Sequence, residues 1–520
     1  MNRFTRRQFL GDVGKGMIVA SVGSSMASEM GLSTAALGAD ADSKPGKLEF
    51  GELEPLVGLM QDTPIERLMP TLVTKLKSGV ELRTLLAAGA LANARTFGGE
   101  DYVGFHTMMA LAPAMHMAGE LPADIRALPV LKVLYRNTNR IHEHGGRASE
   151  VLHAVEPVAT PEGRPGGEVL RDLVRKGDVK GAEETFAALA RISPDEALND
   201  ALMAMQDEAE VHRTVLPYRS WDMLGLIGKE HAHTLLRQSV RYCLAAGMRP
   251  RKDGPPEVLA SMLDAHHLLE KQPGTRVPDD QWVDALAMSI FKATPPQAAE
   301  LAAGALADGI APDSVGQAIC LAANQLILRD IGRTPNDETT NKPIGSVHGD
   351  SIGVHACDSA NAWRNLARVS NVRNTYACLI LGAYQVARDR VGRGGDFLNW
   401  KPLPVQRQVD AIKETDPAAI RQLAEEAIRG NLQAHACAAV ERYGDLGLDP
   451  RPMFDLLLKY AISEDGSLHA EKFYRTASEE FASARPAFRW RQVIALARVT
   501  ASEYGRPAAG YAEAKALLSA

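Results

Sequence analysis

The chain has 520 residues, too many for one small core and enough for two large domains or one extended array of repeats. Aromatic residues make up only 5% of it, while Ala and Leu are abundant, and this composition favours helices over sheets. The net charge of −6 argues against a nucleic-acid-binding protein, which would carry a strongly basic surface.

The first residues resemble a twin-arginine export signal. Arg6 and Arg7 lie in the stretch TRRQFLG (5–11), where the last Gly replaces the Lys of that signal family, and a weakly apolar Gly/Ala/Ser run follows. The resemblance implies that residues 1–41 are a signal peptide and that the Tat export machinery carries the folded chain to the periplasm. No later segment has about 18 uninterrupted apolar residues, so we predict no stable membrane span.

The rest of the chain repeats a pattern of two Ala/Leu-rich helices separated by a sharp turn that contains Gly or Pro. The pattern occurs four times, with these apolar residues at the turn: Val80, Ile192, Ile310 and Leu448. Gly permits the left-handed backbone that ends a helix, and Pro is favoured in the first turn of the next one. We therefore predict an all-α protein, a helical array of about four diverged repeat units packed as two halves, 47–275 and 276–520.

Further helices are predicted after each helix pair, and Pro/Gly-rich linkers separate the units. The predicted later helices are 128–144, 256–271, 376–391 and 491–504. The predicted linkers are 155–168, 271–280 and 397–407.

One histidine follows each helix pair, close to the expected start of the next helix. These histidines are His106, His212, His348 and His469. If the units pack around a common axis, equivalent positions converge, and four imidazoles line one cavity. Neutral imidazole is a common ligand for iron, copper and zinc, so we predict that the four histidines hold a metal ion. The alternative is that each histidine caps its own helix or bonds a neighbouring loop.

A second set of polar residues lies further along these helices. His355 follows His348 by seven residues, nearly two helical turns, so we expect both on one helix face, with Asp358 one turn beyond. We predict catalytic roles for His355, as a second-tier ligand or proton carrier, and for Asp358, as the carboxylate that orients an imidazole. His116 is expected in the same role as His355. Other candidate carboxylates are Glu208, Glu210, Asp350 and Glu471.

Two segments resemble questin-oxidase-like helical proteins: ALADGIAPDSVGQAICLAANQ (305–325) and SVHGDSIGVHACDSANAWRNL (346–366). The resemblance implies an all-helical fold and an oxygen-dependent oxidation of an aromatic compound. The predicted export departs from it, because cytoplasmic reductants are absent from the periplasm.

Together these features predict an exported metal-dependent oxidoreductase or oxygenase that acts on a small organic substrate at a histidine-lined cavity. Two alternatives stay open. One is a helical-repeat scaffold that binds a partner protein without catalysis. The other is a metal-free hydrolase or lyase that uses histidine as a base.

Overall fold

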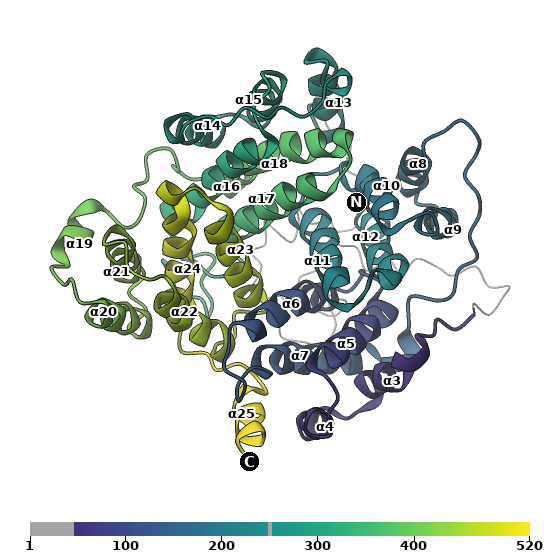
Figure 1. The fold of residues 1–520 in the computed structure, drawn as a ribbon, viewed down its shortest axis with the longest axis horizontal. Helices are drawn as coiled ribbons and strands as arrows, with labels where there is room; N and C mark the ends of the chain where they lie inside the picture. The colour runs from purple at the N-terminus through teal and green to yellow at the C-terminus, as the bar shows by residue number, and fades with distance from the viewer. Residues whose placement is uncertain (1–45, 248–251) are drawn as a thin grey trace.

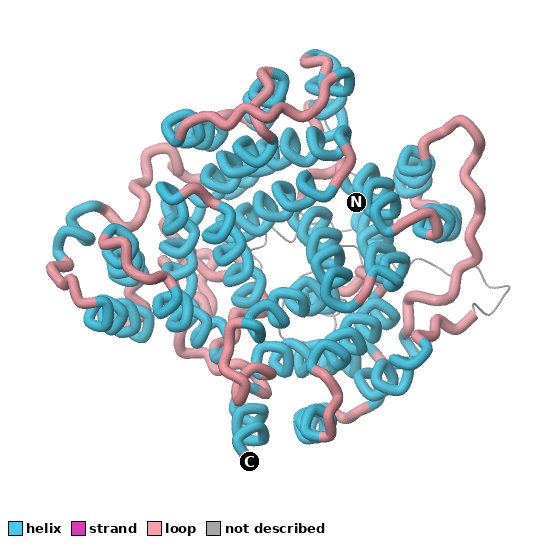
Figure 2. Tube along the Cα trace, in the orientation of Figure 1, coloured by secondary structure: helices cyan, strands magenta, loops and turns pink. Residues whose placement is uncertain are grey.

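The computed structural model describes residues 46–247 and 252–520, and this part of the chain is all-α, as predicted (Figures 1 and 2). It contains 23 α-helices, α3 to α25, with five short 3₁₀ helices and no strand among the described residues. None of these described helices is both long and apolar enough to cross a membrane. The predicted signal peptide, residues 1–41, lies outside the described residues.

The predicted helix pairs are present, and each is followed by two more helices that complete a set of four. The first set is α4 (Ile65–Lys77), α5 (Leu82–Phe97), α6 (Tyr102–Gly119) and α7 (Leu128–His144). The second set is α9 (Val179–Ala190), α10 (Pro194–Met205), α11 (Val211–Ile227) and α12 (Ala232–Ala246). The third set is α15 (Pro295–Ala307), α16 (Pro312–Arg329), α17 (Ile352–Val369) and α18 (Val372–Arg393). The fourth set is α21 (Gln433–Asp445), α22 (Arg451–Ser463), α23 (His469–Ser483) and α24 (Arg489–Glu503).

All four predicted turn residues lie between the first two helices of a set. Gly79 and Gly309 precede two of them with φ of 95° and 78°, a left-handed backbone that ends the helix as expected. That the four sets are diverged copies of one unit, and that the chain divides at residue 275, stay predictions.

The remaining helices lie outside these sets. They are α3 (Glu54–Asp62), α8 (Gly166–Lys176), α13 (Pro255–Ala265), α14 (Asp280–Lys292), α19 (Gln406–Ala411), α20 (Pro417–Arg429) and α25 (Tyr511–Ser519). The helix predicted over 256–271 is shorter than expected. It ends at Ala265, because His267 takes a left-handed φ of 50° that an α-helix cannot continue.

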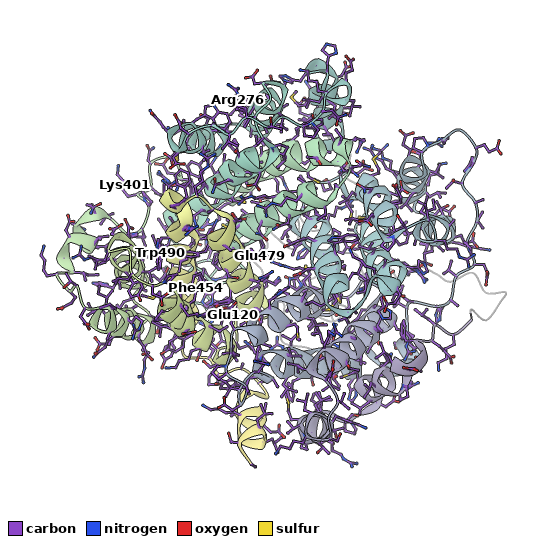
Figure 3. The ribbon with its side chains drawn as sticks, in the orientation of Figure 1. Glu120, Arg276, Lys401, Phe454, Glu479 and Trp490 are labelled. Carbon is purple, nitrogen blue, oxygen red and sulfur yellow. The ribbon has the colours of Figure 1, made fainter. Side chains whose placement is uncertain are left out.

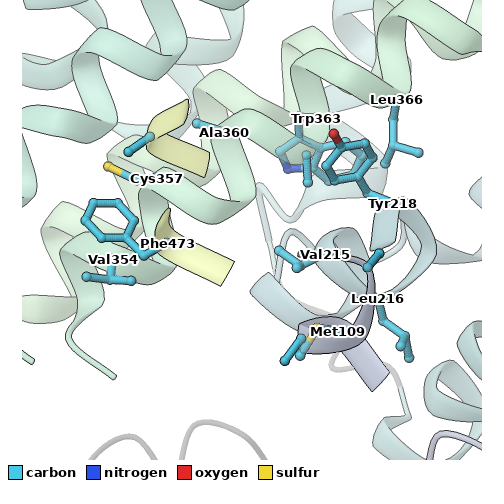
Figure 4. Packing of buried hydrophobic residues seen from close by; sticks show 14 of the residues in the cluster. Met109, Val215, Leu216, Tyr218, Val354, Cys357, Ala360, Trp363, Leu366 and Phe473 are labelled. Atoms are coloured by element: carbon cyan, nitrogen blue, oxygen red, sulfur yellow. The ribbon is translucent and has the colours of Figure 1, made fainter. Parts of the chain in front are cut away.

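The third helix of each set lies at the centre of the molecule (Figure 1). α6 packs against α11, α11 against α17, α17 against α23, and α23 against α6, so these four helices close a ring. The fourth helices, α7, α12, α18 and α24, each pack against the central helix of their own set. Figure 4 shows the apolar packing between central helices, where Met109, Val215, Cys357 and Phe473 are buried.

Contacts between distant segments join the central helices to their surroundings. Glu120, labelled in Figure 3, follows α6. It accepts hydrogen bonds from Arg451 at 2.6 Å and from the Tyr474 hydroxyl at 2.7 Å. Lys132 of α7 lies 2.8 Å from Glu471 of α23, and both side chains are fully buried. These contacts cross the predicted division of the chain, so side chains of both halves meet around the central helices.

Candidate metal centre

Four buried histidines meet inside the ring of central helices. They are His106, His212, His355 and His469, here called the histidine ring, and each lies within the first five residues of its helix. The ring centroids are 4.9 Å apart for His106 and His212, 5.1 Å for His106 and His469, 5.1 Å for His355 and His469, and 6.1 Å for His212 and His355. Exposure of the four residues is 1–4%, so the imidazoles contact one another in the interior.

The imidazoles approach one another as two nitrogen pairs. Nε2 of His106 lies 3.3 Å from Nε2 of His212, and Nε2 of His355 lies 3.0 Å from Nε2 of His469. Nitrogens bound to one tetrahedral metal at 2.0–2.1 Å lie about 3.3 Å from each other. Two facing lone pairs at this separation repel unless a proton or a cation lies between them. Either an Nε2–H···Nε2 hydrogen bond or a cation held between the two nitrogens accounts for the spacing of each pair.

Backbone carbonyls fix the tautomer of two of these histidines. Nδ1 of His106 donates to the Tyr102 carbonyl at 2.7 Å, and Nδ1 of His469 donates to the Ser467 carbonyl at 3.0 Å. A carbonyl oxygen only accepts, so Nδ1 carries the proton in both rings. The Nε2 lone pairs of both histidines are then free to bind a metal ion.

A carboxylate lies beside the third imidazole. Glu210 precedes α11 and accepts from the backbone amides of His212 and Arg213, which caps the helix. Its Oε1 lies 2.6 Å from Nδ1 of His212, and its Oε2 accepts from the Tyr242 hydroxyl at 3.0 Å. Burial raises the pKa of Glu210, but the adjacent His212 outweighs this effect and holds the pKa below its usual value. An ionised Glu210 thus turns Nδ1 of His212 outward and Nε2 toward the ring.

Burial keeps the other imidazoles neutral. It lowers the pKa of His106 and His469 well below the usual value and that of His355 to about 3, and the nearby charge of Lys472 adds to the effect at each. Neutral imidazole is the form that binds metal ions. These three histidines are therefore ligand-competent at neutral pH.

The structure places His348 outside the histidine ring, and His355 takes the position expected for it. α17 begins at Ile352, so His348 lies in the preceding loop. The prediction that His348 and His355 share one helix face was therefore wrong. Its Nδ1 lies 3.2 Å from Nη1 of Arg506 and 4.0 Å from Oε1 of Glu503. Burial and the Arg506 charge lower the pKa of His348 to about 3.

Asp358 does not orient an imidazole in the structure. Its Oδ1 accepts from the Thr476 hydroxyl at 2.8 Å, and no hydrogen bond to His355 is present among the described residues. The prediction was wrong because residues three apart lie on successive turns of a helix. Asp358 therefore lies one turn further along α17 than His355, and not beside Nδ1 of that imidazole. His116 is also outside the ring, where its Nε2 lies 2.9 Å from Asp222.

Two of the other predicted carboxylates, Asp350 and Glu471, have cationic partners. Asp350 lies 2.6 Å from Lys342 and 2.7 Å from Arg333, and Glu471 pairs with Lys132. Glu210 is therefore the predicted carboxylate that contacts a ring imidazole.

The histidine ring is looser than a finished metal site. Within residues 46–247 and 252–520, no group of three or more His, Cys, Asp or Glu side chains is placed so that it could hold a metal ion. The centroids of four imidazoles on one tetrahedral metal are about 5.2 Å apart, given metal–nitrogen distances near 2.0–2.1 Å. Three of the four neighbouring pairs are within a few tenths of an ångström of that value. The fourth pair, His212 and His355, is wider, with 6.1 Å between ring centroids.

No protein-family model, curated protein or solved structure matches this chain. The questin-oxidase-like resemblance stays a prediction based on the two segments that suggested it.

Proposed function

We propose that the protein binds one metal ion within the histidine ring and acts as a metal-dependent oxidoreductase or oxygenase on a small organic substrate. The observation that supports this proposal is the pair of short Nε2–Nε2 contacts, 3.3 Å and 3.0 Å, in each of which one imidazole, His106 or His469, has its Nδ1 bonded to a backbone carbonyl. Nε2 of His106 and Nε2 of His469 therefore each direct a lone pair toward the neighbouring imidazole.

The ligand set favours iron or copper over zinc. Imidazole binds all three metals, but catalytic zinc keeps only three protein ligands and leaves its fourth position for water or substrate. Four imidazoles would fill a tetrahedral zinc ion. Iron and copper can take more than four ligands, so a substrate could still bind. Bound iron or copper would supply electron transfer or oxygen activation.

The protein's own contribution is to hold and shield the site. Glu210 positions the imidazole of His212, and the Tyr242 hydroxyl and the first amides of α11 hold Glu210 in turn. Phe105 and Tyr102 pack against His106 with tilted rings, with centroids 4.9 Å and 4.4 Å away, and cover that side of it. The twin-arginine resemblance is consistent with this proposal, because that route carries folded proteins, often with a cofactor already inserted.

Elemental analysis of the purified protein tests the proposal. We expect about one equivalent of iron or copper per chain, and we expect dialysis against a chelator followed by reloading to remove and restore it together with a metal-centred absorption or paramagnetic resonance signal. A folded protein that contains no metal and takes up neither iron nor copper would contradict it. In that case proton-sharing between the imidazole pairs, without metal, is the better interpretation.

A further inference from the structure

A cavity of about 380 Å³ lies between α8, α13 and the start of α18. Pockets that bind small molecules have volumes of about 300–1,000 Å³, so this one suits a small ligand. α13 packs against α18 and α8 against α10, and Figure 1 labels all four helices. His355 of the histidine ring lies in the first turn of α17, whereas Arg373, which lines the cavity, follows the other end of that helix. About 20 Å of helix therefore separates the cavity from the ring.

Two arginines of the cavity lining, Arg171 of α8 and Arg373 of α18, are held by consecutive residues directly after α10. Nη1 of Arg373 donates to Oε1 of Gln206 at 2.8 Å, and Nε of Arg171 donates to Oδ1 of Asp207 at 2.6 Å. Gln206 and Asp207 are at most 2% exposed, so both partners are fixed in the interior. Both guanidinium groups therefore reach the same cavity from one buried base. Burial, and after it the charge of Arg171, lower the pKa of Arg373.

Arg373 has no acidic partner in the described part of the chain. Its Nη1 also donates to Oδ1 of Asn374 at 2.9 Å, so both of its acceptors are neutral amides. Its Nε and Nη2 form no hydrogen bond with the described residues. Arg171, in contrast, shares the carboxylate of Asp207 with Arg175. One edge of a guanidinium group matches the two oxygens of a carboxylate, so the open Nε–Nη2 edge of Arg373 offers a carboxylate ligand two donors.

One face of α13 forms an apolar side of the cavity. Its four lining residues follow the spacing of three or four positions that places side chains on one face of a helix. They are Pro256, Leu259, Ala260 and Leu263. Leu269, in the 3₁₀ helix Leu268–Glu270, also lines the cavity and is 59% exposed. A ligand with an apolar body would cover these side chains and remove them from water.

The remaining lining residues limit the charge that a ligand can carry. Asp264 and Glu270 line the cavity, and His267 lies beside Glu270 with its Nδ1 3.4 Å from Oε1. In or beside the cavity there are four carboxylates, Asp207, Glu168, Asp264 and Glu270, and three guanidinium groups, Arg171, Arg175 and Arg373. The surroundings thus have no excess of positive charge, so the open guanidinium edge is what attracts an anion. A second negative charge on the ligand would be repelled by the acidic residues of the lining.

We propose that this cavity binds a small organic monocarboxylate, whose carboxylate accepts hydrogen bonds from Arg373 and whose apolar body lies against the cavity-lining face of α13. The proposal goes beyond the metal centre and does not rest on it. The amides that hold Arg373 are themselves fixed, because Gln206 donates to Asn374 at 3.0 Å and Asn374 donates to the Asn199 carbonyl at 2.9 Å. The guanidinium group is therefore held in place before a ligand binds. The competing interpretation is that Arg373 only joins α10 to α18 through these amides.

Isothermal titration calorimetry of the full-length protein with octanoate tests the proposal. We expect saturable binding with a Kd below about 1 mM, and at least about tenfold weaker binding of octan-1-ol, which lacks the carboxylate, and of succinate, which has two. Arg373→Met should weaken octanoate binding at least about tenfold, because it removes a charge-assisted hydrogen bond. Arg175→Met is the matched control, since Arg175 also pairs with Asp207 but does not line the cavity. We expect its octanoate affinity to stay within about threefold of wild type.

A second variant keeps Arg373 and fills the cavity instead. Ala260 is an exposed residue of α13, so Ala260→Trp is expected to fold and to weaken octanoate binding at least about tenfold. Ser261→Trp, at the next exposed position of α13 and outside the lining, should stay within about threefold of wild type. The proposal is overturned if wild type does not bind octanoate, or if it binds octan-1-ol or succinate as tightly. It is equally overturned if folded Arg373→Met or Ala260→Trp binds octanoate as tightly as wild type.

Discussion

The histidine ring and the His348 cluster lie on either side of the start of α17 and bury histidines in opposite surroundings. The His348 cluster consists of His348, Arg333, Lys342, Asp350, Glu503 and Arg506. In the ring, imidazoles face imidazoles, and the proton-bearing nitrogens of His106 and His469 donate to carbonyls behind them. In the cluster, His348 faces the guanidinium of Arg506. Arginine only donates and stays charged, so it occupies the imidazole lone pair and repels a metal ion. Burial alone therefore does not make a histidine a metal ligand. The groups that its two ring nitrogens face determine whether it can bind a metal ion.

The cluster instead holds the loop that leads into α17. The Gly349 amide donates to Oε1 of Glu503 at 2.8 Å, and the Val347 amide donates to the Ser502 hydroxyl at 2.9 Å. Burial raises the pKa of Glu503 to about 7. These bonds attach the loop to the end of α24, and Gly349 then lies directly against His469 of the ring. The cluster is a support for the ring.

The largest expected difference between the two regions is in metal binding. Replacing His355 with Ala should weaken iron or copper binding more than about 100-fold, because losing a ligand exceeds the 10–100-fold cost of losing an outer contact. His348→Ala should retain metal, since its imidazole faces Arg506. Elemental analysis after dialysis against a graded chelator measures both. Retention by His355→Ala together with loss by His348→Ala would reverse the assignment.

The next largest effect is expected at Glu210. Glu210→Gln should lower metal affinity about 10–100-fold, because an amide neither carries the charge nor fixes the His212 tautomer as the carboxylate does. Asp222→Asn is the matched control, since it alters another carboxylate–histidine pair, with His116, outside the ring. We expect unchanged affinity for the control in chelator competition. Equal losses in both variants would show a general charge effect.

A substitution of Gly349, in the loop held by the His348 cluster, should also disturb the histidine ring. A Cβ there would lie 2.4 Å from Cβ of His469 and 2.9 Å from Oε1 of Glu503, so Gly349→Ala must move the loop or α23. We expect a destabilisation of about 1–3 kcal/mol in urea unfolding, with weaker metal binding. Gly392→Ala, at a helical position where a Cβ meets nothing within 4 Å, should be neutral or slightly stabilising. Indistinguishable behaviour of the two variants would argue against the tight contact.

The smallest expected effect is on the pH dependence of folding stability. It distinguishes the role of the His348 cluster from metal binding. In metal-free protein, His348 and His355 have folded-state pKa values of about 3, against an ordinary value of about 6.5 in the unfolded chain. Between these values the unfolded chain binds more protons, so stability falls as pH drops from about 6.5 toward 3 and is fully present above 6.5. His348→Asn should reduce this slope by up to about 1.4 kcal/mol per pH unit. Urea unfolding in chelator at several pH values checks this, and an unchanged slope would contradict the buried, neutral state of His348.

Much of the fold was predictable because helix formation is local. Turns at Val80, Ile192, Ile310 and Leu448 were recognisable from neighbouring Gly and Pro, and all four lie between helices as predicted. Three of the four predicted metal ligands, His106, His212 and His469, meet in the structure for the same reason: each begins the helix after a recognisable pair. The third set departs from the pattern, because the loop before α17 runs through His348 and the helix starts four residues later.

By itself, the sequence determined that this protein is built of helices, where the turns within its four helix pairs lie, and that histidines follow the helix pairs. Only the tertiary structure decided that His355 and not His348 completes the ring, and that Glu210 and not Asp358 contacts an imidazole. The physical reason is range: helix periodicity and turn residues act over a few positions, whereas the ring joins side chains more than 100 residues apart. Their meeting depends on which helix faces pack together and on where one loop becomes a helix.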